Sequence, residues 1–389
     1  MKPFDFQLPT IIKIRNGLFK DTASYIKKHI QGRRVLIVTD PGIEQLGYPS
    51  ELSNQLNSLG YVCTVYTNVK PNPRDVDCIN GGERAREFQA DLIVAIGGGS
   101  VIDSAKAIAI LSVFGGSTQD YSGKDLVPGP VLPLVVIPTT AGTGAEVTRS
   151  SVITDSEKKR KFTIKDVHIA PKLALVDPEL TYKLPALLTA STGMDALVHA
   201  IEAYTCKLSN PIAEGLAIEA MTHIYPYLKR AVLNGEDYEA REHLMIGSTI
   251  AGMAFSHADV ASVHCMAEAI GGLYDTPHGI ANSMFLPYVL AFNAETEPVK
   301  HGVIARTLGL ADPAIGDEEA TQRLVEAMKQ LAREIRIPTF ASLPSVRPED
   351  FSALSEAAFQ NGSTPSNART ITKEDYLNLF KKAYHQPIE

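Results

Sequence analysis

The sequence predicts an α/β N-terminal half, built on a doubly wound parallel sheet, followed by an all-α C-terminal half. Apolar runs at 34–40, 91–96 and 133–137 alternate with helical stretches, which is the pattern of parallel strands buried on both faces. From about Pro185 the strand-like runs vanish, and Ala-, Leu- and Glu-rich helical periods continue almost to the C-terminus. A chain of 389 residues is too long for one ordinary core. We therefore expect two domains, residues 1–184 and 185–389.

The N-terminal half is predicted to alternate strands and helices. Residues 4–20 predict two strands joined by a turn at Asn16-Gly17, and a helix then continues to Ile30. Further strands are expected at 34–40, 61–66, 91–96 and 133–137, and helices at 50–59, 75–89 and 101–111. Three short β segments, at 151–153, 161–164 and 173–176, complete this half.

Composition and charge exclude several classes of protein. With 44% hydrophobic and 21% charged residues, the chain is globular rather than disordered. The formal net charge of -7 and the pI near 5.8 argue against nucleic acid or an anionic membrane as the main partner. No apolar run is long enough to span a bilayer, and the N-terminus has no signal-peptide core. The four cysteines show no paired spacing, so we expect a reduced, cytoplasmic compartment.

Two turns rich in small residues are candidates for binding phosphate. Gly97-Gly98-Gly99-Ser100 lies between a predicted strand and a predicted helix, where free N–H groups and the helix dipole favour an anion. The spacing is not G-x-G-x-x-G, but ligands bind at the carboxyl ends of such strands. Thr139-Thr140-Ala141-Gly142-Thr143-Gly144 follows another buried strand. Each turn alone fits a plain loop, whereas two at neighbouring strand ends favour a clamp for a pyrophosphate.

Asp40 ends the predicted strand at 34–40, and two roles are possible for its carboxylate. Its carboxylate could accept both hydroxyls of an adenosine ribose and would repel a 2′-phosphate, which favours NAD over NADP. Alternatively, it only caps the following turn with Pro41-Gly42.

Four side chains in the C-terminal half form a candidate metal site. Asp195 and His199 are four residues apart in a predicted helix and share one face. His264 lies in a second apolar run, and His278 follows a Gly-Gly break. Each histidine alone is more often a satisfied core residue, but burying Asp195 without a cation or donor would cost on the order of several kcal/mol. One carboxylate and three imidazoles make a complete ligand set for Fe2+ or Zn2+.

Together these motifs resemble the iron-containing (group III) alcohol dehydrogenase family along almost the whole chain. The matching residues are the Asp40 strand end, Pro71-Asn72-Pro73, Gly97–Ser100 with Asp103 and Lys106, residues 138–148, Lys161, Gly193-Met194-Asp195 with His199, and His264 with Thr276-Pro277-His278-Gly279. The fourteen-residue separation of the last two histidines is highly specific. The resemblance implies a dehydroquinate-synthase-like architecture and NAD(P)-linked interconversion of an alcohol and an aldehyde or ketone.

The resemblance also implies roles for individual residues. It makes Asp195, His199, His264 and His278 the metal ligands, with Fe2+ expected and Zn2+ as the alternative. The expected cofactor-binding residues are Asp40, Asn72, Gly97, Gly98, Gly99, Ser100, Asp103, Thr139, Thr140, Thr143 and Lys161. The N-terminal strand of the family commonly takes part in dimer contacts, so we expect a homodimer or a higher homo-oligomer.

The sequence departs from the family pattern at two places. Glu268 stands where a second histidine is common, and His257-Ala258-Asp259 replaces a segment close to Asn-x-Gly. His257 and Glu268 are candidate proton relays; alternatively, Glu268 pairs with a base such as Arg149. The loop 361–369 resembles the family's closing loop near the substrate, with Ser363 facing the pocket. These acidic residues predict a small, polar primary alcohol or aldehyde as the metal-bound substrate in hydride transfer with nicotinamide C4.

The sequence leaves two kinds of alternative function. The first is a polyol dehydrogenase resembling glycerol dehydrogenase, or a protein resembling dehydroquinate synthase. The second belongs to another class, a non-catalytic NAD-binding protein that retains the fold. Dehydroquinate synthases use a glutamate ligand and a lysine-rich phosphate pocket that are not evident here, and an intact ligand set argues against a non-catalytic protein.

Overall fold

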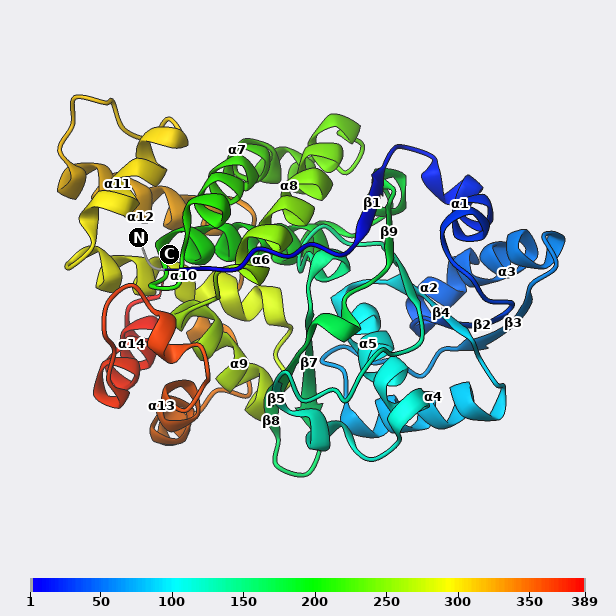
Figure 1. Cartoon of the computed structure of the whole chain (residues 1–389). Coiled ribbons are helices and arrows are strands. Elements are labelled where there is room, and N and C mark those ends of the chain that lie inside the picture. Colours follow the sequence, from blue (N-terminus) through cyan, green and yellow to red (C-terminus); the bar gives the residue numbers. More distant parts are fainter. Residues whose placement is uncertain (1–2, 388–389) are drawn as a thin grey trace. The chain divides into compact units, whose positions relative to one another are not determined.

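The computed structural model describes residues 3–387, which form two compact units (Figure 1). The α/β unit comprises Leu8–Thr140 and Gly144–Tyr182. The helical unit comprises residues 183–387, the described residues up to Gln7, and Ala141–Thr143. One unit contains a parallel sheet with helices, and the other is mostly helical. This arrangement confirms the predicted fold class. The predicted division into two domains, residues 1–184 and 185–389, stays a prediction.

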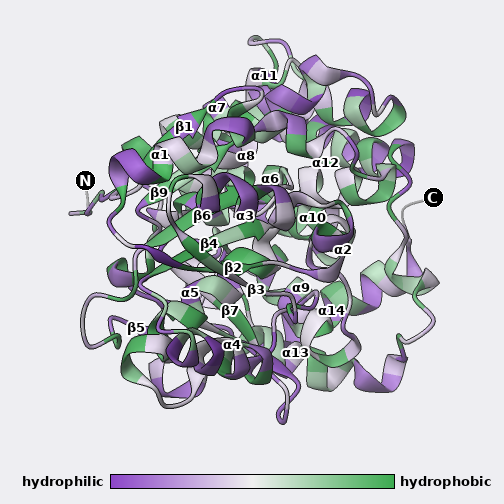
Figure 2. Cartoon of the chain, turned by 90° about the vertical axis from the view of Figure 1, so that its right-hand side faces the viewer, coloured by the Kyte–Doolittle hydropathy of each residue, from purple (hydrophilic) through white to green (hydrophobic). Residues whose placement is uncertain are grey.

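The α/β unit is built on a six-stranded sheet in the order β1-β9-β6-β4-β2-β3, and every neighbouring pair is parallel. The strands are β1 (Ile11–Ile14), β2 (Arg34–Val38), β3 (Val62–Tyr66), β4 (Leu92–Gly97), β6 (Leu134–Pro138) and β9 (Leu173–Val176). The central strands are almost entirely buried, and Figure 2 colours them as hydrophobic. Helices on both faces explain these unbroken Val, Ile and Leu runs.

The helices of this unit are α1 (Thr22–His29), α2 (Pro41–Gln45), α3 (Tyr48–Ser58), α4 (Asp75–Glu87) and α5 (Gly99–Phe114). Ile26 of α1 and Leu56 of α3 share a core cluster with Ile37 and Val94 of the sheet. Most of α5 is buried, which fits a helix packed between the main sheet and the smaller sheet.

The predicted pair of strands within residues 4–20 is wrong. Only β1 forms there, and it pairs in parallel with β9, more than 150 residues along the chain. The turn at Asn16-Gly17 leads instead into a 3-10 helix, because the Asp177 carboxylate accepts hydrogen bonds from the N–H groups of Gly17 and Phe19 at 3.0 and 2.8 Å. A distant carboxylate therefore determines this turn, and no local pattern reveals it.

The strand order reverses between β2 and β4. The chain runs from β2 to β3 on one side and then returns to place β4 on the other side of β2. In open α/β sheets a ligand binds outside the carboxyl ends of the strands at this reversal. Asp40 follows β2, the glycine turn follows β4, and Thr139 follows β6. All three predicted cofactor segments thus lie at the edge where such a ligand binds.

A three-stranded sheet of β5 (Gly123–Lys124), β8 (Arg160–Lys165) and β7 (Ser150–Asp155) completes the α/β unit. Lys106 of α5 is fully buried beside it and donates to Ala145 O, Thr148 Oγ1 and Ser150 O at 2.7–2.8 Å. Burial lowers the pKa of Lys106 to about 8, which the nearby Asp103 carboxylate at 3.7 Å partly opposes. Lys106 therefore ties α5 to the segment that follows the hydroxyl-rich turn.

The helical unit consists of α6 (Ala186–Thr205), α7 (Pro211–Leu233), α8 (Tyr238–Ser256), α9 (Ser262–Tyr274), α10 (His278–Ala294), α11 (Pro298–Thr307), α12 (Asp317–Glu334), α13 (Phe351–Phe359) and α14 (Lys373–His385). Helix α6 packs against α7, α8 and α10, and α9 packs against α10 and α13 (Figure 1). Among the described residues, no helix has the length and apolar character needed to cross a membrane.

Candidate metal centre

Helix α6 positions the first two candidate ligands. Asp195 and His199 are separated by one turn, and Glu202 follows at the next position on the same face. All three residues are at most 4% exposed. The helix approaches α7 closely at Gly193, where a Cβ atom would lie 2.3 Å from Leu228 Cδ1. At 3.6 residues per turn, Gly193 lies on the opposite side of α6 from these three residues, so α7 covers the far side of the helix and the charged face is turned toward α9 and α10.

Helices α9 and α10 bring the two remaining histidines to this face. His264 lies in the first turn of α9, and His278 is the first residue of α10. The start of α10 reaches α6 only because residue 279 is glycine: a Cβ there would lie 2.3 Å from Ser191 O and 2.7 Å from Ser191 Oγ. Gly279 therefore sets how closely His278 can approach Asp195.

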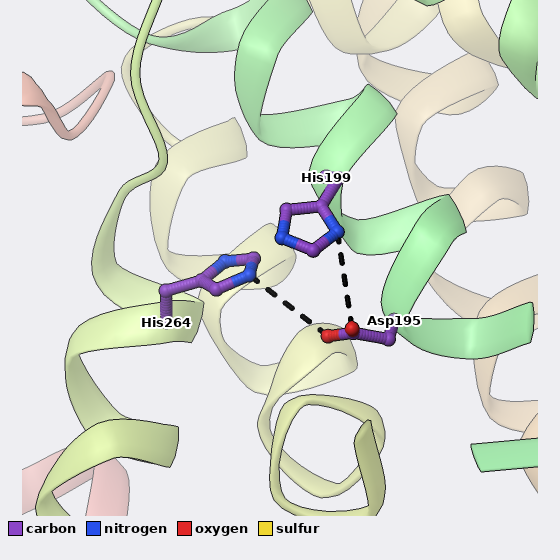
Figure 3. A group of neighbouring side chains, drawn as sticks. All are labelled: Asp195, His199 and His264. Carbon is purple, nitrogen blue, oxygen red and sulfur yellow. Dashed lines mark ion pairs between the residues drawn. The ribbon is translucent and has the colours of Figure 1, made fainter. Parts of the chain in front are cut away.

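Asp195 is the centre of the cluster (Figure 3). Its carboxylate lies 3.9 Å from His199 Nδ1, 4.0 Å from His264 Nε2 and 3.7 Å from His278 Nε2. Candidate ligand atoms of Asp195, His199 and His264 all lie within 4.8 Å of one another, and these three form the one such group found among residues 3–387. Asn282, one turn after His278, donates to Asp195 Oδ1 at 2.6 Å.

The charges of the cluster act on one another. Burial lowers the pKa of His199 to about 4, which leaves its imidazole neutral at neutral pH. Burial also raises the pKa of Asp195, but the three histidines outweigh it and the net direction is downward. For His264, burial lowers the pKa, and the hydrogen bond and charge of Glu202 more than offset it, so that the net direction is upward.

The donor set fits a divalent cation. His199 Nδ1 and His264 Nε2 are buried nitrogens without a hydrogen-bond partner, and both face the Asp195 carboxylate. Unpaired buried polar atoms are costly, and a cation bonded to both nitrogens and to a carboxylate oxygen would remove that cost. Mixed imidazole and carboxylate ligands suit Fe2+ and Zn2+.

Two further residues, Glu202 and Asn282, contact the candidate ligands and were not among the residues expected from the sequence. Glu202 accepts a hydrogen bond from His264 Nδ1 at 2.6 Å, and Asn282 binds Asp195. The i, i+4, i+7 spacing of Asp195, His199 and Glu202 was the available signal for the first. Asn282 stands four residues after His278, which is the corresponding signal for the second.

The predicted relay residue His257 lies just after α8. Its Nδ1 contacts Met253 O at 2.7 Å, its Nε2 contacts Gln7 O at 2.8 Å, and its ring stacks on Phe6 with centroids 3.9 Å apart. Both ring nitrogens are therefore occupied by carbonyl groups. Its role as a proton relay stays a prediction.

The other departures from the family pattern hold the loop 361–369. Within the helical unit, Glu268 accepts from Asn361 Nδ2 at 2.6 Å. Asp259 accepts from Ser363 Oγ at 3.2 Å and from Ser366 Oγ at 2.6 Å. Glu268 stands one turn after His264 on α9, so the carboxylate that holds this loop is adjacent to the metal cluster.

The glycine turn of the α/β unit has the geometry of an anion cradle. Helix α5 begins at Gly99, two residues earlier than predicted, which places Ser100 in its first turn. A Cβ at Gly97 would lie 2.5 Å from Val101 Cγ2, and one at Gly98 would lie 3.2 Å from Thr140 Oγ1. A side chain at residue 97 would therefore press on Val101 in the first turn of α5, where the free N–H groups and the helix dipole favour an anion.

The remaining predicted cofactor residues of this unit are held in place by one another or by the backbone. Asp40 Oδ1 accepts from the N–H groups of Gly42 and Ile43 and caps α2, so the capping reading is correct for this oxygen. Lys161 Nζ donates to Asn72 Oδ1 at 2.8 Å, and the Asn72 backbone is left-handed with φ 52°. Asp103 Oδ2 accepts from Val152 N at 3.0 Å.

The hydroxyl-rich turn divides between the two units. Thr139 and Thr140 end the α/β segment after β6, whereas Thr143 belongs to the helical unit. Gly142 packs in the helical unit, where a Cβ would lie 2.7 Å from Thr192 Cβ and 3.1 Å from Thr192 O. The cofactor roles of these residues stay predictions.

Family comparisons identify the class of protein that this fold and cluster define. The model of "Iron-containing alcohol dehydrogenase" matches residues 9–178, and that of "Fe-containing alcohol dehydrogenase family, C-terminal" matches residues 189–384. The chain belongs to the iron-containing alcohol dehydrogenase family, as the resemblance implied, and it is an oxidoreductase of that class.

Individual relatives match along nearly their full length. An NAD-dependent methanol dehydrogenase from Bacillus methanolicus is 39% identical over 97% of this chain and 99% of its own. A 1,3-propanediol dehydrogenase from Klebsiella pneumoniae is 35% identical over 98% and 99%. The crystal structure of a 1,3-propanediol oxidoreductase superposes with a TM-score of 0.94, covering 98% of this chain and 100% of that one at 35% identity.

Proposed function

We propose that this alcohol dehydrogenase interconverts a short, polar primary alcohol and its aldehyde with NAD, using an iron ion held by Asp195, His199, His264 and His278. The observation that supports this most strongly is the pair of unpaired, buried histidine nitrogens facing the Asp195 carboxylate. A cation bound there would supply a Lewis acid for the substrate oxygen, and NAD would supply the hydride acceptor. Zn2+ is the alternative ion, because it binds mixed N/O sites more tightly than Fe2+.

This chain's residues would contribute orientation and charge. Asn282 holds one oxygen of Asp195, and the histidines from three helices are fixed by packing, so the ligands are arranged before an ion arrives. In the α/β unit, the turn Gly97–Ser100 would hold the pyrophosphate of NAD at the start of α5. One oxygen of Asp40 caps α2, while Oδ2 makes no hydrogen bond to the described residues and would accept from the ribose.

Substrate choice is proposed to depend on Glu268. One of its oxygens holds Asn361, while Oε1 makes no hydrogen bond to any described residue. A carboxylate one turn from His264 would accept a hydrogen bond from a second hydroxyl of the substrate. Two similar proteins are named after 1,3-propanediol, an alcohol with a second hydroxyl, which supports this preference. Hydrogen bonds to a charged group contribute about 1.5–3 kcal/mol, which corresponds to roughly 10–100-fold in binding.

A substrate series tests this preference. We expect kcat/KM for 1,2-propanediol, 1,3-propanediol and glycerol to exceed that for ethanol and butanol. Changing Glu268→Leu should lower the values for the diols about 10-fold or more and leave ethanol nearly unchanged. NADH formation followed by absorbance measures both. The highest kcat/KM on butanol, or an equal loss on all alcohols in E268L, would contradict the proposed contact.

The pH dependence of metal binding is a second test. An ion requires His264 Nε2 without a proton, and the pKa of His264 is raised above its usual value. Metal affinity should therefore fall as pH decreases through that raised pKa, by about tenfold per pH unit for one competing proton. A second proton should compete only near pH 4, the pKa of His199. Co2+ titrations between pH 8 and pH 5 measure the slope, and constant affinity would contradict this ligand assignment.

We also propose a homo-oligomer located in the cytoplasm. Strand β1 is an edge of the main sheet, its outer side has no partner strand within residues 3–387, and Ile11 and Ile14 are exposed. Such an edge can pair with a second copy. The four cysteines are free, as expected in a reducing compartment. Light scattering coupled to size-exclusion chromatography tests the assembly, and a monomer at micromolar concentration would contradict it.

A further inference from the structure

We propose that Glu202 is a positioning residue for the metal centre, which holds His264 with Nδ1 protonated and with the Nε2 lone pair directed at Asp195. The inference rests on the ligand set of the proposed function. Glu202 is neither part of the family motifs named above nor one of the candidate metal ligands.

Three donors converge on the Glu202 carboxylate. Oε2 accepts from Ala261 N at 2.8 Å and lies 2.6 Å from His264 Nδ1, and Oε1 accepts from Val263 N at 2.7 Å. The side chain is 4% exposed, so water does not compete for these contacts. An ionised carboxylate can only accept hydrogen bonds, so each of its three neighbours must donate one. The two backbone N–H groups do so, and His264 Nδ1 must therefore carry a proton.

The hydrogen bond determines the tautomer of His264. A neutral imidazole carries one N–H, so a proton on Nδ1 leaves Nε2 as a lone pair. That Nε2 is the buried nitrogen that lacks a partner and lies 4.0 Å from Asp195 Oδ1. Metal-bound histidines commonly donate their other N–H to a carboxylate, which fixes the ring and makes it a stronger ligand.

Glu202 also connects the helices that carry the ligands. Asp195, His199 and Glu202 lie at i, i+4 and i+7 on α6, so one helix supplies two candidate ligands and the hydrogen-bond partner of a third. The carboxylate reaches the first turn of α9 through Val263 N and His264. The position of His264 relative to Asp195 thus depends on a single side chain.

A glutamine at this position cannot make the same three contacts. Its amide has one acceptor oxygen and one NH2 group, which is a donor only. In the place of Oε1 the NH2 group meets the N–H of Val263, whereas in the place of Oε2 it meets both the N–H of Ala261 and His264 Nδ1, and it then favours the tautomer with a proton on Nε2. The first arrangement strains the start of α9, and the second blocks the nitrogen that would bind the ion.

The test compares metal affinity in Glu202→Gln and wild-type protein. Metal-free protein is titrated with Co2+ against a competing chelator, and we expect a Kd about 10–100-fold weaker in the variant. The matched control is Thr205→Val in the same helix, because within residues 3–387 the buried Thr205 hydroxyl donates to Ile201 O and to no other group. Its Kd should equal the wild-type value.

A second measurement detects the proton itself. In the Co2+-loaded wild type, NMR should show a slowly exchanging, paramagnetically shifted signal from the His264 Nδ1–H, which E202Q should lose. If E202Q lowers the melting temperature of the metal-free protein but keeps the wild-type Kd and this signal, Glu202 only caps α9 and the inference is wrong. His264→Ala separates the two proposals: an unchanged Kd in that variant would overturn the ligand set itself.

Discussion

Replacing His264 with alanine is expected to abolish both metal retention and turnover. The His264 Nε2 faces Asp195 from α9, and it is the member of the candidate ligand group among the described residues that comes from this helix. Losing one of four ligands would leave Asp195 buried beside a weakened site. We expect less than 0.1 ion per chain by elemental analysis, and a kcat reduced by about 1,000-fold or more, because the ion supplies several kcal/mol of charge stabilisation.

NAD affinity separates this effect from unfolding. The predicted cofactor residues lie mainly in the α/β unit, so NADH binding measured by fluorescence should remain within a few-fold of wild type in the His264→Ala protein. His243→Ala is the matched control, because His243 lies in the same unit, stacks on Tyr227 and touches none of the candidate ligands. That variant should keep its metal and its turnover. Full turnover of metal-free His264→Ala protein would contradict the mechanism.

Gly279→Ala is expected to weaken metal binding without changing any ligand. The new methyl group would lie 2.3 Å from Ser191 O, a backbone atom of α6 that cannot move aside without moving the helix. The start of α10 must therefore shift by about 1 Å to reach normal contact distance, and His278 moves with it. Misplacement of this size can cost about 100-fold in rate, and we expect a similar loss in kcat/KM together with weaker Co2+ binding.

Gly215→Ala provides the control for this substitution. Gly215 lies in α7, where a Cβ would meet nothing within 4 Å. Alanine in a helix is more stable than glycine by about 0.5–1 kcal/mol, so the control should melt slightly higher and keep wild-type kinetics. Wild-type metal affinity and kcat/KM in Gly279→Ala would show that the close approach of α10 to α6 does not determine the site.

Elements that depend on local pattern could be predicted from the sequence. The runs that became β2, β4 and β6 are continuous and apolar because they are buried on both faces, and the glycines after β4 mark the turn into α5. Elements that depend on distant partners could not. β1 forms because β9 offers it a parallel edge, and the turn at Gly17 depends on Asp177.

The same distinction holds for the site. The motif around Asp195 and the spacing of His264 and His278 resemble a known family, so the candidate ligands could be named before their distances were known. The spacing of Glu202 from Asp195 and His199 places it on the same helix face, but a glutamate in a helix is usually exposed, and only its burial against α9 shows that three donors meet it. Likewise, the contact of Glu268 with Asn361 joins positions 93 residues apart.

The most direct test is a crystal structure of the iron- or zinc-loaded protein with anomalous scattering recorded at the metal edge. We expect one peak, about 2.0–2.2 Å from a carboxylate oxygen of Asp195 and from one ring nitrogen each of His199, His264 and His278. A peak elsewhere in the chain, or an ion at 195 and 199 that His264 and His278 do not reach, would contradict the four-residue centre.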